Sequence, residues 1–470
     1  MDSPEGGSDR GRARWEPFLL SAGTIALLGL LTVLARAGYT PHGTRAVDIV
    51  SSLRPSVALP PHRISALEDS VEASAAPVTP HSARHAIDLS WLDTAGVVPL
   101  ENADASLAPF FLAIREGRTA RVAWFGDSFT EGDILVGDLR EMLQRTFGGG
   151  GVGLVAPTPP VARYRATVVQ TFSDDWKERN LMSHGGPQIP LGITGRASMP
   201  KIGKDSAFRS WVHMESGDKP GTKRFERLRM LFAAGGDPLD SARISWAGGS
   251  ITIGLGVRTD LRTATISLPS VSSVRIAFQV RDTVAVQGIS LEEEPAGVLI
   301  DNLSFRGNSG VGVLKIPAGV LAGTHRDLGY SLVVLQFGAN VADSTMAGYG
   351  WYRDRLIEVV GRVHSTFPGA GVLLVSVPDR GVKDTAGNIV THPSIPLILK
   401  AQREAAVRAG CGFWDLRKAM GGDNAMARWA EAGMVAPDYV HISQNGGRRL
   451  AKALAKSVGQ AWTRAKEPSP

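Results

Sequence analysis

One short apolar run that ends in a serine constrains the fold of this chain more than any other feature. Residues 122 to 125 are apolar and favour a buried β-strand, and Gly126 ends the run. Asp127 and Ser128 follow at once, and apolar residues at helical spacing begin at Ile134. In α/β sheets, ligands bind outside the carboxyl ends of the strands. The run therefore predicts an α/β fold that presents Ser128 at its functional edge.

Two segments far downstream carry the groups that a nucleophilic serine needs. A serine hydroxyl is weak at neutral pH unless a base takes its proton and donors stabilise the oxyanion. Asp438 and His441, three residues apart, supply an acid and a base. A second apolar run, residues 332 to 337, leads into a Gly-Ala-Asn turn that ends at Asn340. The three blocks together predict a Ser-His-Asp triad with an amide donor.

In this order, the blocks resemble those of the SGNH (GDSL-type) hydrolases. Gly126-Asp127-Ser128 matches the first block, Gly338-Ala339-Asn340 the third, and Asp438-x-x-His441 the last. The resemblance implies a flavodoxin-like, three-layer α/β fold and a carboxylic ester hydrolase that works through an acyl-enzyme. Ser128 is then the nucleophile, His441 the general base and Asp438 the residue that orients it.

The same resemblance implies an oxyanion hole. Its donors are the backbone N–H of Ser128, the side-chain amide of Asn340 and the backbone N–H of a glycine in the second block. Residues 298 to 310 are the candidate for that block. Gly307 falls at the family's position counted from the apolar run, and Gly310 is the alternative if an Arg-Gly-x-Ser-Gly form is matched. The chain departs from the family at Phe129, where histidine is frequent, and at Ser304, where glycine is frequent.

The spacing of the blocks predicts an inserted domain. About 180 residues separate Ser128 from Gly307, whereas a plain βαβ step needs about 30. Short alternating runs with regular turns predict a jelly-roll-like β-sandwich over residues 166–296. We expect its ends to lie together and residues 170 to 204 to form a long loop over the site. If the hydrolase half still folds after deletion of about residues 166–296, we expect activity on small acetyl esters to be spared more than activity on the glycan. Runs in this insert begin at residues 227, 242, 250, 263 and 274.

The remaining chain divides around this insert. Hydrolase segments are expected at 87–165 and 297–465. Residues 1–16 would be a cytoplasmic tail, 17–37 a transmembrane anchor and 38–86 a flexible tether. These segments predict a single-pass inner-membrane protein with its catalytic domain in the periplasm or another extracytoplasmic space. The alternative is a signal peptide cleaved after Ala35-Arg36-Ala37, which would release a secreted protein.

Composition excludes several classes of function. The formal net charge is +6, but the basic residues are scattered and no basic-aromatic stripe suggests nucleic acid. Cys411 is the single cysteine and has no companions for a disulfide or a zinc site. We expect no cofactor and no metal. Asp133 is interpreted as a helix cap or, alternatively, as a hydrogen-bonding partner of the active-site turn. Further residues are expected to be structural, namely Asp379 in a turn, His325 and His392 on the surface, and Trp211 and Trp246 in a core.

With its long β-rich insert, the chain resembles exported peptidoglycan O-acetylesterases in particular. This resemblance implies a substrate, an O-acetylated extracytoplasmic glycan. An O-acetyltransferase with the same triad is an alternative, and its partner would be an acyl-donor membrane protein. A third hypothesis is a non-catalytic glycan-binding protein, in which the hydrolase fold is a relic. The intact Ser128, Asn340, Asp438 and His441 favour the enzyme.

Overall fold

The computed structural model describes residues 87–91, 96–184, 189–205, 207–257, 260–294 and 297–465. These residues belong to one compact unit, Thr79–Pro470, of the two into which the chain divides. The expected tail, anchor and tether at 1–16, 17–37 and 38–86 lie outside the described residues. Within those ranges, no helix combines the length and the apolar character needed to cross a membrane.

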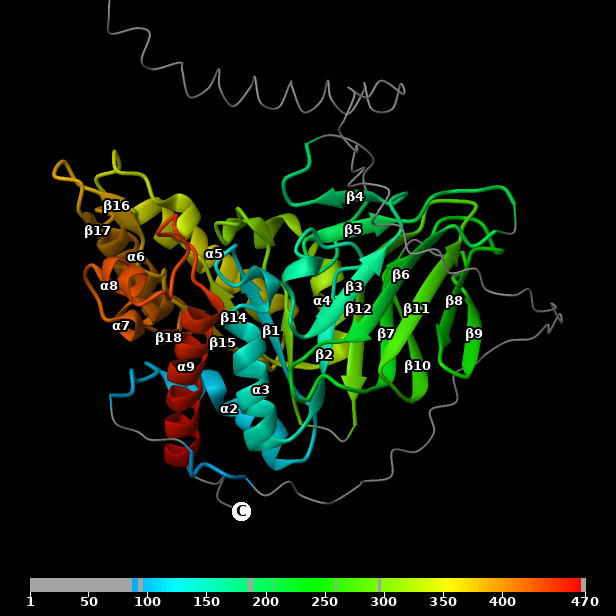
Figure 1. Cartoon of the computed structure of the whole chain (residues 1–470), viewed down its shortest axis with the longest axis horizontal. Coiled ribbons are helices and arrows are strands. Elements are labelled where there is room, and N and C mark those ends of the chain that lie inside the picture. The colour runs from blue at the N-terminus through cyan, green and yellow to red at the C-terminus, as the bar shows by residue number, and fades with distance from the viewer. Residues whose placement is uncertain are drawn as a thin grey trace, which may run out of the picture. The chain divides into compact units, whose positions relative to one another are not determined.

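A five-stranded parallel sheet forms the centre of the α/β part (Figure 1). Its order is β13-β1-β14-β15-β18, which reads 2-1-3-4-5 along the chain and is the flavodoxin-like order. Every residue of these strands is buried, as expected for parallel strands that are covered on both faces. The expected α/β fold with its parallel sheet is confirmed. The strands are β1 (Ala120–Gly126), β13 (Val298–Asn302), β14 (Tyr330–Gln336), β15 (Gly371–Val375) and β18 (Gly412–Trp414).

Helices cover both faces of the sheet. Alternation along β1 sends Val122 and Trp124 into one apolar core and Ala123 and Phe125 into the other. The first core also contains residues of α2 (Ala103–Arg115), α3 (Val136–Phe147) and α9 (Gln444–Arg464). The second contains residues of α4 (Ala318–Leu328), α5 (Gly350–Thr366) and α6 (Ser394–Ala409). Two apolar cores on opposite faces make this part a three-layer fold.

Shorter elements line the carboxyl edge of the sheet or connect its strands. They are the 3-10 turns η2 (Glu131–Asp133), η3 (Ala162–Tyr164), η4 (Val311–Lys315) and η5 (Ala339–Val341), the helices α7 (Leu416–Met420) and α8 (Ala425–Glu431), and the hairpin of β16 (Gly381–Lys383) with β17 (Ile389–Thr391).

The long insert is a sandwich of two antiparallel sheets around its own apolar core. The five runs expected from the sequence become β7, β8, β9, β10 and β11. One sheet contains β10 (Arg262–Val271), β7 (Phe225–Ala233), β12 (Ala285–Glu293), β5 (Arg196–Met199) and β4 (Lys177–Asn180), with β2 (Gly150–Val155) also paired to β12. The other contains β3 (Val168–Phe172), β6 (Ser210–Ser216), β11 (Ser273–Gln279), β8 (Ser241–Trp246) and β9 (Gly249–Gly254).

Two boundaries differ from expectation. The sandwich begins at β2, before residue 166, because β2 pairs with β12 and not with the parallel sheet. Its two ends meet where the Val298 N–H donates to the Gly148 carbonyl at 2.9 Å. Residues 170 to 204 are not one long loop, because they contain β4 and β5. Each of these strands has only four residues, which is too few for an alternating apolar pattern to stand out in the sequence.

Candidate active site

The turn after β1 explains why the sequence reads Gly-Asp-Ser. A Cβ on Gly126 would lie 2.6 Å from the Ser304 Oγ, so a larger residue cannot stand there. The Asp127 carbonyl accepts hydrogen bonds from the N–H groups of Thr130 and Glu131, at 3.3 and 3.1 Å, which closes the turn. Ser128 is half-buried at its apex. The strand and the turn together therefore fix where the Ser128 hydroxyl points.

The structure brings Ser128, His441 and Asp438 into one hydrogen-bonded series, although 313 residues separate the first two. The distance from His441 Nε2 to Ser128 Oγ is 2.8 Å, and that from His441 Nδ1 to Asp438 Oδ2 is 2.7 Å. These distances lie within the range that a Ser-His-Asp triad requires. The order Ser, His, Asp in space is the one expected from the sequence.

The loop that carries the acid and the base is held by its own hydrogen bonds. Asp438 Oδ1 accepts the backbone N–H groups of Val440 and His441, at 2.9 and 3.0 Å. Burial alone would raise the pKa of Asp438, but the hydrogen bonds from His441 and Val440 lower it on balance. Asp438 therefore stays ionised and accepts a hydrogen bond from the N–H at His441 Nδ1. This leaves Nε2 without a proton and facing the serine.

Asn340 lies beside the nucleophile, as the third block implied. Its Nδ2 donates to the Asn308 carbonyl at 3.1 Å and to Asp127 Oδ2 at 3.4 Å. The second block is therefore in direct contact with Asn340. The contact to Asp127 is the longer and weaker of the two.

The two candidate glycines of the second block differ in what their N–H groups do. The Gly310 N–H donates to Asn308 Oδ1 at 2.9 Å, and a Cβ on Gly310 would press on Phe337 in the core. In the part of the chain that the structure describes, neither the Gly307 N–H nor the Ser128 N–H makes a hydrogen bond. Gly307 has φ +75°, a conformation that favours glycine. The geometry thus favours Gly307 over Gly310 as a donor to a ligand.

Asp127 is a buried acid that sequence reasoning treated only as part of a motif. Its side chain has no exposed surface, and Oδ1 accepts the Phe129 N–H at 2.9 Å. Burial raises the pKa of Asp127 to about 7, although the Phe129 hydrogen bond and nearby His441 oppose the shift. No pattern in the sequence distinguishes this acid from an exposed turn residue.

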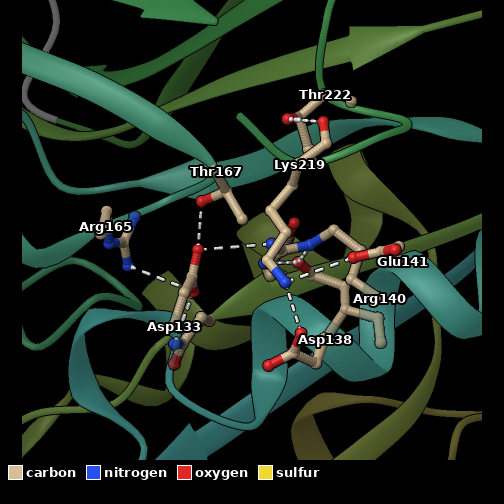
Figure 2. Close-up of polar contacts among 12 residues, drawn as sticks. Asp133, Asp138, Arg140, Glu141, Arg165, Thr167, Lys219 and Thr222 are labelled. Carbon is tan, nitrogen blue, oxygen red and sulfur yellow. Dashed lines mark hydrogen bonds and ion pairs between the residues drawn. The ribbon is translucent and has the colours of Figure 1, made fainter. Parts of the chain in front are cut away.

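Asp133 does not cap a helix, so the favoured interpretation was wrong and its alternative holds. The residue before α3 is Leu135, and no side chain caps the helix there. The Asp133 carboxylate instead accepts Asn302 Nδ2 at 2.7 Å and Arg140 Nη1 at 3.3 Å, and it also accepts the Thr167 hydroxyl (Figure 2). Asn302 Nδ2 also donates to the Thr130 carbonyl in the nucleophile turn, at 2.9 Å.

The charge on Asp133 is compensated although it is buried. Arg165 lies 3.9 Å from Asp133 Oδ1. Burial would raise the pKa of Asp133, but Arg165 and Arg140 outweigh that effect and hold the pKa well below its usual range. Arg165 and Thr167 lie within the sandwich segment, next to β3. One part of the insert is therefore bonded to the turn that follows Ser128.

Glu131 makes a second link between the insert and the site. Arg196 of β5 lies 3.4 Å from Glu131 Oε1, and Arg306 Nε donates to Glu131 Oε2 at 2.7 Å. Arg306 directly precedes Gly307, and a Cβ on Gly307 would lie 3.1 Å from the terminal methyl of Met182, between β4 and β5. Residues of the insert therefore contact both the nucleophile turn and the Gly307 turn, which the sequence did not predict.

The other residues singled out in the sequence have structural surroundings. Asp379 is buried and accepts the Thr391 hydroxyl and the Met426 N–H, both at 2.9 Å, so it organises a loop rather than an exposed turn. His392 is buried rather than on the surface, and His325 is half-buried. Trp211 and Trp246 are half-buried, Cys411 and Phe129 lie in apolar cores, and Ser304 Oγ contacts the Thr130 hydroxyl at 2.8 Å. Among the described residues, no group of three or more His, Cys, Asp or Glu side chains could hold a metal ion.

Comparison with known proteins identifies the fold. No protein-family model and no curated protein matches this sequence. Among solved structures, a peptidoglycan O-acetylesterase is similar over 77% of this chain and 99% of its own, with a TM-score of 0.64 and 22% identity. The expected likeness to this class of SGNH hydrolases is confirmed at the level of fold.

Two further structures match a smaller part of the chain. A carbohydrate acetylesterase, Est24 of Sinorhizobium meliloti, is 15% identical over 35% of this chain and 79% of its own, with a TM-score of 0.26. The aryl esterase of M. smegmatis is 18% identical over 35% of this chain and 79% of its own, with a TM-score of 0.24. These scores are too low to inform the fold of this chain.

Proposed function

We propose that this protein is a serine esterase that removes O-acetyl groups from an extracytoplasmic glycan, with peptidoglycan as the substrate. One observation carries the proposal, namely the hydrogen-bonded series from Ser128 Oγ through His441 to Asp438 at 2.8 and 2.7 Å. The fold shared with a peptidoglycan O-acetylesterase over most of both chains supports the choice of reaction and substrate.

In the first half of the proposed reaction, Ser128 Oγ attacks the ester carbonyl carbon while His441 Nε2 takes its proton. Asp438 holds the imidazole in the tautomer that leaves Nε2 free and stabilises the imidazolium that forms. The tetrahedral intermediate then collapses and releases the sugar hydroxyl, which takes the proton back from His441. An acetyl group remains on Ser128.

In the second half, a water molecule loses its proton to His441 and attacks the acetyl-enzyme, and acetate leaves as Ser128 regains its proton. Both tetrahedral intermediates carry an oxyanion. The N–H groups of Ser128 and Gly307, which are free of other hydrogen bonds in the described residues, and the Asn340 amide are its donors. The 3.4 Å contact from Asn340 to Asp127 is the bond that an oxyanion would replace.

The test is hydrolysis of p-nitrophenyl acetate and then of O-acetylated peptidoglycan, by the wild-type protein and by Ser128→Ala. We expect both activities in the wild type and neither in the variant, with unchanged thermal unfolding. The matched control is Ser304→Ala, because Ser304 follows β13 and contacts the Ser128 turn through Thr130, and in the described residues its hydrogen bonds go to Thr130 and Asn302. Ester hydrolysis that survives in Ser128→Ala would overturn the proposal.

For the location of the protein, the proposal rests on the sequence alone. An uncharged, mainly apolar run over residues 17–35, flanked by Arg14 and Arg36, supports an N-terminal anchor at 17–37 with the catalytic unit outside the cytoplasm. Fractionation of cells should then recover the protein with membranes. A soluble extracytoplasmic protein whose N-terminus begins at Gly38 would support the signal-peptide alternative instead.

A further inference from the structure

Arg380 lies between the two loops that carry the proposed catalytic groups. It follows β15, at the carboxyl edge of the parallel sheet. Its Nη1 donates to the Ala339 carbonyl at 3.2 Å, one residue before Asn340. The next N–H, that of Gly381, donates to the Tyr439 carbonyl at 2.9 Å, one residue after Asp438. Arg380 is therefore bracketed by the oxyanion side and the base side of the site.

The guanidinium of Arg380 has no counter-charge. Its Nε is enclosed without a hydrogen-bond partner, and its Nη2 is not enclosed and makes no hydrogen bond in the described part of the chain. Within the same residues no carboxylate lies at ion-pair distance. Arg196 and Arg140, which also flank the site, are each paired with a carboxylate. A half-buried cation without an anion is costly unless a ligand supplies one.

The positive charge also reaches neighbouring groups. Burial lowers the pKa of His392, and Arg380 lowers it further. His392 donates its backbone N–H to the Arg380 carbonyl at 2.7 Å, so the two residues belong to one loop. Asp343 acts in the opposite direction on the pKa of His392, so the positive charge of this loop is partly offset there but not at Arg380, which makes no ion pair in the described residues.

We propose that Arg380 binds a carboxylate on the substrate, so that the enzyme prefers O-acetylated sugars that carry a carboxylate group. This inference rests on the proposed esterase function. With Nη1 held by the Ala339 carbonyl and Nε enclosed, Nη2 remains to donate to a single negative group, and arginine binds carboxylates through directed, charge-assisted hydrogen bonds. The Arg380 contact would hold the sugar while its acetyl group lies at Ser128.

The test uses two substrates that differ at one group, the charged carboxylate of O-acetylated N-acetylmuramic acid and its neutral carboxyl methylamide. In the wild type, we expect kcat/KM to be about tenfold or more higher for the carboxylate form, since hydrogen bonds to charged groups are worth about that much or more. Arg380→Gln should lose this preference through a higher KM, with kcat and the rate on the methylamide nearly unchanged. Arg380→Lys should retain part of the preference because it keeps the charge.

Arg362→Gln is the matched control. Arg362 is also half-buried and donates to a backbone carbonyl, that of Ile316 at 3.4 Å, but it lies on α5 away from the catalytic loops. This variant should keep the wild-type preference.

Three results would overturn the inference. The first is a wild type that hydrolyses p-nitrophenyl acetate and both sugars without preference, which leaves the esterase proposal standing. The second is an Arg380→Gln variant that loses kcat equally on both sugars, which would make Arg380 a support for the Ala339 turn. The third is a wild type that is inactive on p-nitrophenyl acetate, in which case the proposed function fails as well.

Discussion

The nucleophile and the base meet at one point, but the two loops that carry them are held in opposite ways. The nucleophile turn is buried, and two carboxylates, Glu131 and Asp133, lie behind Ser128 and pair with arginines. The base loop lies near the surface, where the side chains of Asp438 and His441 are 49% and 41% exposed. Its shape depends on its own hydrogen bonds and on one contact from Gly381 to the Tyr439 carbonyl.

The difference in how the two loops are held follows from their backbone conformations. Behind Ser128 the chain passes through positive φ angles at Asp133 and Leu135, which cost free energy in residues other than glycine. Buried ion pairs from the insert and α3 hold that conformation (Figure 2). In the base loop only Tyr439 has a positive φ. Changes in the nucleophile turn should therefore cost both stability and activity, whereas changes in the base loop should cost activity alone.

The largest expected effect is on activity and lies in the base loop. His441→Ala should lower kcat on p-nitrophenyl acetate by about 10⁴-fold or more, because the serine then lacks its base. The midpoint of thermal unfolding should hardly change, since the His441 side chain is partly exposed and supports no core. A large drop in the unfolding midpoint would show that the base loop is structural, and the contrast between the loops would fail.

Asp133→Asn should have the largest effect on stability. Removing the charge takes from Arg140 the carboxylate it pairs with and from Arg165 the nearest of its counter-charges, and we expect a loss of about 3–5 kcal/mol in the free energy of unfolding. Urea unfolding followed by circular dichroism measures it. Asp438→Asn is the control, with similar chemistry in an exposed loop, and should leave the free energy of unfolding nearly unchanged while activity falls. Equal destabilisation by the two variants would contradict the comparison.

Asn340→Ala tests the donor that lies between the two loops. The amide acts on the oxyanion, which exists only in the transition state and intermediate, so kcat should fall by about a hundredfold with a smaller change in KM. Steady-state kinetics on p-nitrophenyl acetate separates the two parameters. A raised KM with unchanged kcat would assign Asn340 to substrate binding instead.

A further expected effect is a change in how stability depends on pH. The folded-state pKa of Asp127 is about 7, above an unfolded value of about 4, so the folded state holds the proton more tightly. Asp127 therefore contributes a destabilisation that is absent below about pH 4, grows up to about pH 7 and is constant above it. Asp127→Asn should remove this pH dependence, so that the variant gains stability relative to the wild type between these values.

At low pH, the protonation of two other carboxylates should lower the stability of the fold. The pKa of Asp133 is lowered in the folded state, and although burial would raise the pKa of Glu292, Arg121 and Arg229 lower it to about 2. The stability from these two groups is present above about pH 4 and is lost as the pH falls towards their folded values. Measuring the free energy of unfolding from pH 3 to 8 separates the loss of stability at low pH from the loss between about pH 4 and 7 that is due to Asp127.

The sequence predicted the parts of this molecule that local patterns encode. Apolar runs that end in turns located β1 and β14, and alternating runs located the sandwich strands. Ser128, Asp438 and His441 could be singled out because they occupy recognisable blocks, and the structure places them within hydrogen-bond distance of one another. Side-chain contacts between residues far apart in the sequence could not be predicted, because no local pattern indicates that Arg196 contacts Glu131 or that Thr167 contacts Asp133.

These missed contacts also bear on the expected effect of deleting the insert. Alternation and turn residues reveal that a segment forms a sandwich, but they say nothing of which of its side chains cross to another sheet. The buried cluster of Arg121, Glu292 and Asp301, at 2.7 and 2.8 Å, is a further link between β1, β13 and the insert. Deleting the sandwich would leave Arg121 without Glu292 and Asp133 without Arg165, so the remaining chain is not expected to fold.

The most direct test of the central claim is covalent labelling of the nucleophile. The wild-type protein is treated with phenylmethanesulfonyl fluoride, residual esterase activity is followed, and the labelled peptide is located by mass spectrometry. The account predicts one label per chain, on Ser128, formed in proportion to the loss of activity and strongly slowed in His441→Ala. Complete loss of activity with the label on another residue, or full activity in protein labelled at Ser128, would contradict it.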